Sequence, residues 1–180
     1  MLPVAPLMIE HRLIERMIKL MDAEINSIKQ NNHPNIDFIN TAIDFIRTYA
    51  DKLHHGKEED ILFKDLAKKR LSAEHKKIMD ELIQEHVLGR SKVKKLIEAR
   101  SRYIRGEKIA VKEMLENMEI LAKFYPKHIE KEDKRFFLPV MNYLNEQEKE
   151  GMLQESYEFD RKFIHTKYKD IVVELEGTKI

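Results

Sequence analysis

The chain of 180 residues contains no cysteine. Disulfide bonds, iron–sulfur clusters and thiolate zinc sites are therefore excluded. Any metal ion bound by this chain needs ligands from the side chains of histidine, aspartate, glutamate or tyrosine.

The chain also lacks an excess of charge of one sign and a long apolar segment. It has 33 lysine and arginine residues against 32 aspartate and glutamate residues, so long-range attraction to nucleic acid or anionic lipid is weak. No segment approaches the roughly 18 apolar residues of a membrane span, and no basic stretch precedes an apolar one at the start of the chain. We therefore expect a cytoplasmic protein that binds neither nucleic acid nor membranes.

Glycine and proline are scarce, with five residues of each, whereas leucine, isoleucine, lysine and glutamate are abundant. This composition predicts an all-α protein with long helices and few turns. The apolar spacing and cap signals place helices at about residues 6–30, 37–68, 72–105, 108–137 and 145–176. We expect a single domain over residues 1–180, in which an antiparallel up-and-down four-helix bundle of about residues 6–140 is joined by an additional C-terminal helix.

Two segments of the expected helices place a glutamate four residues after a histidine. These pairs are His54 with Glu58 and His128 with Glu132. Four residues is about one helical turn, so the imidazole and the carboxylate share a face and can bind the same metal centre. One such pair is weak evidence, but two copies favour a metal site.

The first pair has a competitor, because His55 and Glu59 have the same spacing. Backward steps of four residues from His54 reach the apolar Ala50 and Ile46, whereas the same steps from His55 reach charged residues. An α-helix with these faces directs His54 inward and His55 outward. We therefore select His54 and Glu58 and expect the other pair to face solvent.

Two further histidines, His11 and His86, lie on apolar helical faces. A single histidine in such a place is usually a core residue whose ring nitrogens form hydrogen bonds. Four histidines and two glutamates that converge from four helices would instead bury costly charge unless a cation neutralised it. The group as a whole therefore indicates a metal site.

These motifs resemble the hemerythrin HHE cation-binding family over about residues 6–140. The residues that carry the resemblance are Glu10-His11, His54-x-x-x-Glu58, Glu85-His86-Val87-Leu88-Gly89-Arg90 and His128-x-x-x-Glu132. The resemblance implies two non-haem iron ions bridged by Glu58 and Glu132, with His11, His54, His86 and His128 as the other ligands. Manganese and zinc are alternatives, since imidazole and carboxylate suit them as well.

Oxygen carriers of that family have a fifth histidine one turn from the ligand on the third helix. Here Leu82 and Arg90 occupy the positions four residues from His86, so the fifth ligand is expected to be missing. His165 is an additional candidate ligand if the last helix folds over the end of the bundle.

Three functions follow from this sequence. The first is a non-enzymatic di-iron protein that binds or senses O2 or NO, or handles iron, and this is the one we favour. The second is a di-iron enzyme that reduces NO or peroxide. The third is a helical structural or interaction module without metal, whose histidines are hydrogen-bonded core residues.

Overall fold

The computed structural model describes the backbone of residues 1–177 and the side chains of residues 1–165 and 167. The described chain is helical and contains no β-strand. The helices are α1 (Ala5–Asn31), α2 (Ile36–Phe45), α3 (Lys64–Leu66), α4 (Ala73–Ile104), α5 (Val111–Lys131), α6 (Phe137–Val140) and α7 (Glu146–Gly177). The π-helical segments η1 (Ile46–His55), η2 (Glu58–Phe63) and η4 (Glu132–Phe136) continue α2 or α5, and the 3-10 turns η3 (Lys108–Ala110) and η5 (Met141–Tyr143) lie at helix ends. The predicted all-α class is confirmed.

Local signals in the sequence explain where the helices begin and end. The Ser72 hydroxyl accepts a hydrogen bond of 3.1 Å from the His75 amide and so caps α4. Before α7, the Asn145 and Glu148 side chains each accept a bond of 2.9 Å from the other's backbone amide, which is the reciprocal pattern of a capping box. Gly106, with φ of +102°, supplies the left-handed turn after α4.

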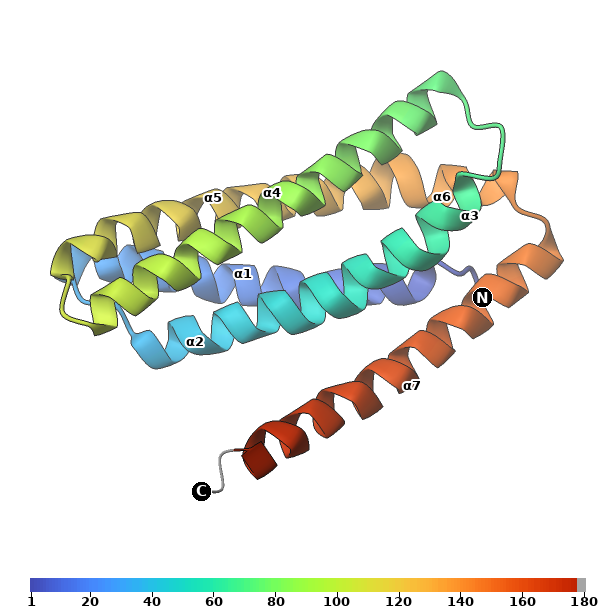
Figure 1. Cartoon of the computed structure of the whole chain (residues 1–180). Coiled ribbons are helices and arrows are strands. Elements are labelled where there is room, and N and C mark those ends of the chain that lie inside the picture. The colour runs from blue at the N-terminus through green and yellow to red at the C-terminus, as the bar shows by residue number, and fades with distance from the viewer. Residues whose placement is uncertain (178–180) are drawn as a thin grey trace.

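Four long helical segments lie side by side, as Figure 1 shows: α1, the run from α2 to α3, α4, and the run from α5 to α6. The helix α7 (red) runs along one side of them, and the N-terminus lies near its first turns. No described helix is both long and apolar enough to cross a membrane.

Two apolar clusters fill the space between the long segments. The larger cluster includes Ile14, Ile46, Leu96 and Leu121 and contains residues of α1, α2, η1, α4 and α5. The second cluster includes Leu7, Leu62, Leu82 and Phe136. The buried polar side chains of the described chain include five histidines and three glutamates, and none of these belongs to either cluster.

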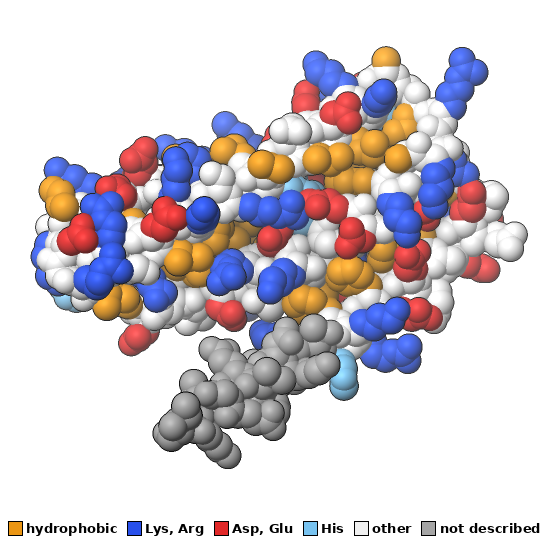
Figure 2. Space-filling model, in the orientation of Figure 1, with side chains coloured by type: hydrophobic (Ala, Val, Ile, Leu, Met, Phe, Trp, Pro, Cys, Tyr) orange, Lys and Arg blue, Asp and Glu red, His pale blue; other side chains and the backbone are white. Residues whose placement is uncertain are grey.

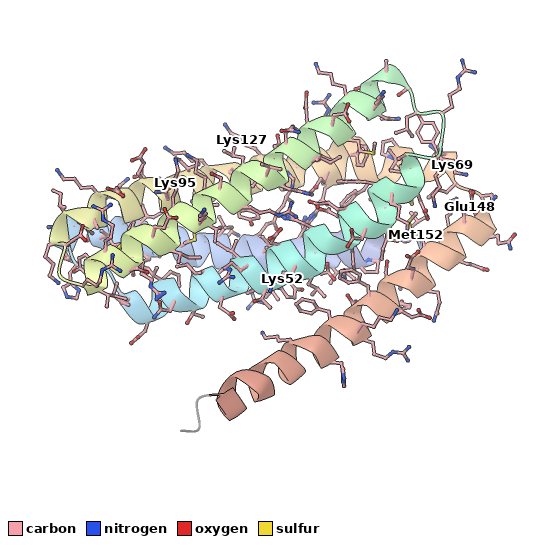
Figure 3. The ribbon with its side chains drawn as sticks, viewed as in Figure 1. Lys52, Lys69, Lys95, Lys127, Glu148 and Met152 are labelled. Carbon is pink, nitrogen blue, oxygen red and sulfur yellow. The ribbon has the colours of Figure 1, made fainter. Side chains whose placement is uncertain are left out.

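The helix α7 is anchored to the other helices near its first half. Met152 is 3% exposed and belongs to the second apolar cluster, and Figure 3 shows it next to Glu148 and Lys69, which form an ion pair. Further along, the ring of Phe159 packs against Gly56, where a β carbon would come within 2.9 Å of the ring. The lack of a side chain at Gly56 therefore allows this close approach.

Leu82 and Leu88 provide a matched test of the core. Both lie on α4, but Leu82 is fully buried in the second apolar cluster whereas Leu88 is 43% exposed. Leu82→Ala should lower the free energy of unfolding by about 2 to 5 kcal/mol, because it removes buried methyl groups and leaves a cavity. Leu88→Ala should change it by less than about 1 kcal/mol. Urea unfolding followed by circular dichroism measures both, and equal effects would contradict this core.

Candidate metal centre

All six of the candidate metal ligands named from the sequence meet between the two apolar clusters. They come from different segments: His11 from α1, His54 from η1, Glu58 from η2, His86 from α4, His128 from α5 and Glu132 from η4. Each of the six side chains is at most 2% exposed. The helix order alone could not show that these positions stand at the same height along the helices.

The ligand atoms form two groups that share Glu58. One group contains His11, His54, Glu58 and Glu132, and the other contains His55, Glu58, His86 and His128. Within each group the ligand atoms lie within 4.8 Å of one another, which is close enough to surround one metal ion.

The carboxylates of Glu58 and Glu132 each direct one oxygen toward an imidazole of the first group and the other oxygen toward an imidazole of the second. Glu58 Oε1 lies 3.4 Å from Nε2 of His54, and its Oε2 lies 3.3 Å from Nε2 of His86. Glu132 Oε2 lies 3.2 Å from Nε2 of His11, and its Oε1 lies 3.2 Å from Nε2 of His128. Carboxylates placed in this way can bridge two ions.

His55 lies inside the protein, so the prediction that it faces solvent is wrong. It also adds a fifth imidazole where the sequence predicts that one is missing. It is 2% exposed, and its ring stacks on that of His86 with 3.9 Å between centroids. The error came from assuming an α-helix, because residues 46–55 are π-helical and the Gly56 amide bonds to the Asp51 carbonyl, five residues back. In this wider helix His54 and His55 both reach the inside, so the fifth imidazole comes from η1 and not from α4.

His165, the additional ligand candidate, is exposed on α7 and belongs to neither group. Arg90, which occupies one position where the fifth histidine was sought, binds the carboxylates of Asp51 and Glu59 at 2.7 and 2.8 Å. The structure thus places His165 apart from both groups of candidate ligands.

Each of the five inner imidazoles has a carboxylate beside its outer nitrogen, Nδ1. These outer contacts are His11 to Asp133 at 2.7 Å, His54 to Glu10 at 2.8 Å, His55 to Asp51 at 3.4 Å, His86 to Glu59 at 2.6 Å and His128 to Glu85 at 2.8 Å. A neutral imidazole that donates from Nδ1 keeps the lone pair of Nε2 free, which is the usual arrangement of a histidine that binds a metal.

The outer carboxylates were missed in the sequence, although a signal was present. Glu10, Glu59, Glu85 and Asp133 each stand directly beside a ligand in the chain. Each of them binds the imidazole of a different segment: Glu10, for example, follows Ile9 and precedes His11 but contacts His54. The outer contacts therefore connect the long segments to one another.

Basic side chains neutralise part of this outer ring. Lys57 is 1% exposed and forms ion pairs with Glu10 and, at 2.8 Å, with Asp160 of α7. Arg12 pairs with Asp133, and Lys131 lies 2.6 Å from Glu85. The inner carboxylates have no such lysine or arginine among their contacts in the described chain.

The inner polar atoms lack partners and so fit a pair of metal ions. Both carboxylate oxygens of Glu58 and of Glu132 are buried without a hydrogen bond, as is Nε2 of His86 and of His128. Nε2 of His11 and Nε2 of His54 lie only 2.9 Å apart while both Nδ1 atoms face carboxylates. Buried acceptors that face one another are costly, and cations between them would remove that cost.

Without metal, the same groups have displaced pKa values. Burial lowers the pKa of His11, but the carboxylates of Asp133 and Glu132 outweigh it and raise the value to about 10. Burial likewise opposes protonation of His86, yet its contacts with Glu132 and Glu58 raise its pKa to about 11. For His55 burial dominates and lowers the pKa to about 4. Protons and metal ions therefore compete for these nitrogens.

The comparison with protein families agrees with this geometry. The model of the hemerythrin HHE cation binding domain matches residues 2–138, which include all five inner histidines and both glutamates. Searches of the curated proteins and of the solved structures gave no significant match.

His55→Ala tests the corrected ligand set. The change removes one imidazole from the group that also contains His86 and His128, so we expect it to lower metal content by about half and to weaken retention in the presence of a chelator by about 10-fold or more. Elemental analysis of purified protein measures this. His165→Ala is the matched control and should retain full metal content, whereas equal loss in both variants would contradict the assignment.

The pKa values predict opposite pH trends for the metal-free and metal-loaded protein. In the metal-free protein the raised pKa values of His11 and His86 stabilise the fold fully below about pH 6.5. This contribution is lost as the pH rises toward about 10, so the urea midpoint should fall between roughly pH 6.5 and 9.5. In the metal-loaded protein the midpoint should rise over this range, because fewer protons compete for the ligands. Parallel trends in the two forms would show that these imidazoles do not exchange protons for metal.

Proposed function

Since this chain belongs to the hemerythrin HHE cation-binding family, we propose that it is a non-haem di-iron protein that binds or senses O2 or NO, or handles iron. The observation that carries the proposal is the set of five buried imidazoles, each with a carboxylate at Nδ1 and with Nε2 directed toward two shared carboxylates. Imidazole and carboxylate ligands are common to iron, manganese and zinc sites. The choice of iron rests on the family.

We interpret the long segments as an antiparallel four-helix bundle with α7 as an extra helix. Each of its four segments contributes at least one inner histidine. A ligand set distributed in this way fixes the distance between the two ions through the packing of the helices.

The two ions would have unequal surroundings. His11 and His54 would hold one ion, and His55, His86 and His128 would hold the other, with Glu58 and Glu132 between them. The ion beside His11 and His54 would have fewer imidazole ligands from the protein, which would leave room for a small molecule there. Two ferrous ions would supply redox chemistry toward O2 or NO, while the protein fixes the ligands and limits the access of water.

The different number of imidazoles around the two ions also supports an alternative function. In this alternative the protein is an enzyme that reduces NO or peroxide at the di-iron centre. A small reactant needs a free position on a metal and a route to it, and the side with two imidazoles would offer the position. The Phe137 ring stacks on His11 with 5.5 Å between centroids, so an aromatic ring lies beside this imidazole. Catalytic turnover of NO or peroxide distinguishes the enzyme from a protein that only binds the gas.

Metal analysis with absorption spectroscopy tests the proposal. Protein purified from iron-supplied cells should contain about two iron ions per chain, and its near-ultraviolet absorption should change when the reduced protein meets O2 or NO. Glu58→Gln should reduce the iron content to well below one ion per chain, because Glu58 belongs to both ligand groups. His33→Ala alters an exposed histidine and serves as the control. A chain that stays metal-free and cannot be reconstituted would instead be a helical module without metal.

A further inference from the structure

A cavity of about 360 Å³ lies between η1, α4 and α5, beside the metal centre. One of its lining residues is His55, which belongs to the group with three imidazoles. The cavity volume lies within the range of small-molecule sites and far exceeds the space that a diatomic gas requires. The cavity therefore has room for an organic molecule.

The inner walls of this cavity are mainly apolar. They include Ile46 and Val93, which are buried, together with Ile97 and the ring of Tyr125. Gly89 is also part of the lining and adds no side chain that would fill the space. Such walls favour the hydrocarbon part of a ligand.

The outer part of the cavity is positively charged. Arg47, Arg90 and Lys94 line it, against the single carboxylate of Asp51. Arg90 and Asp51 already bind each other at 2.7 Å, and Arg90 also binds Glu59. Arg47 and Lys94 are exposed and form no ion pair with the described part of the chain. Two cations thus remain available at the mouth of an apolar cavity.

The carboxylates around the metal centre do not form ion pairs with Arg47 or Lys94. The inner carboxylates lie toward the imidazoles, and the outer carboxylates Asp51 and Glu59 are occupied by His55, His86 and Arg90. On the face that α4 helps to form, Figure 2 shows both blue basic and red acidic side chains around orange apolar ones. An amphiphilic anion matches this distribution of charge and apolar surface.

We propose that this cavity is a binding site for a short-chain organic monocarboxylate, with its hydrocarbon chain along Ile46, Val93 and Ile97 and its carboxylate between Arg47 and Lys94. This binding site goes beyond the proposed function, because apart from His55 neither the walls nor the two cations belong to the ligand groups. The position of His55 places the inner end of such a ligand next to the metal centre. A bound molecule would therefore lie against the side of the centre that has three imidazoles.

Calorimetric titration of the full-length protein with hexanoate tests the site. Hexanoate should bind in a saturable manner with one molecule per chain. It should bind at least about tenfold tighter than acetate, which has four fewer carbons to bury. It should also bind about two- to fivefold tighter than hexan-1-ol, which lacks the charge. Equal affinity for hexanoate and acetate would overturn the proposal.

Variants at the mouth locate the carboxylate. Arg47→Ala and Lys94→Ala should each weaken hexanoate binding about two- to fivefold and leave hexan-1-ol binding unchanged. Lys95→Ala is the matched control, since this neighbouring exposed residue of α4, labelled in Figure 3, does not line the cavity. No effect of either mouth variant would show that the carboxylate binds elsewhere.

Two further measurements separate this site from the metal centre. Val93→Phe adds a bulky ring to the cavity wall and should abolish hexanoate binding while iron content stays at the level of the unmodified protein. Removal of metal by a chelator should change hexanoate affinity by less than about threefold, because the proposed contacts involve no metal. Loss of binding on metal removal would mean that hexanoate is simply a metal ligand, and it would contradict this proposal without affecting the di-iron one.

Discussion

The structure depends on one constraint, which is the burial of two carboxylates, Glu58 and Glu132, in the middle of the helices. Neither has a lysine or arginine partner in the described chain, and their oxygens face imidazole nitrogens on both sides. Charge buried in this way is costly unless opposite charge lies close to it. Protons on the imidazoles provide that charge in the metal-free protein, as the raised pKa values of His11 and His86 show. Two metal ions would provide it more effectively, because each would also satisfy the free lone pairs of several ligands.

The outer carboxylates link the buried centre to the packing of the helices. His54 of η1 is bound by Glu10 of α1, and His128 of α5 is bound by Glu85 of α4. A change in the packing of any two of these helices would move an imidazole away from its carboxylate. The same contacts fix which ring nitrogen faces inward, so the geometry of the centre and the assembly of the helices depend on the same hydrogen bonds. The apolar clusters on either side then hold the helices at the required spacing.

Sequence patterns were sufficient for the helices and for the six candidate ligands that the fold brings together, because both follow from short-range spacing. The capping box at Asn145 and Glu148 and the paired His-x-x-x-Glu motifs are examples. His55 could not be found in this way, since its inward direction depends on π-helical hydrogen bonds that a period of 3.6 residues does not represent. The outer carboxylates were hidden for another reason. Four of the five contact an imidazole of a distant segment, and only the packed helices reveal such pairs, although the acids that stand beside His11, Glu58, His86 and Glu132 in the chain provided a clue.

The helix α7 lies outside the family match, which ends at residue 138, yet it contacts the metal centre indirectly. Gly56 and Lys57 stand between the inner residues His55 and Glu58, and both are covered by α7, Gly56 by Phe159 and Lys57 by Asp160. Lys57 is almost fully buried, so its ammonium group requires the carboxylates of both Glu10 and Asp160. Glu10 in turn holds Nδ1 of His54. Displacement of α7 would remove Asp160 from Lys57. Glu10, which orients His54, would then be the only carboxylate that pairs with the Lys57 ammonium group. The position of α7 is therefore linked to the basicity of His54, a candidate metal ligand, through the ion pairs of Lys57 with Asp160 and Glu10.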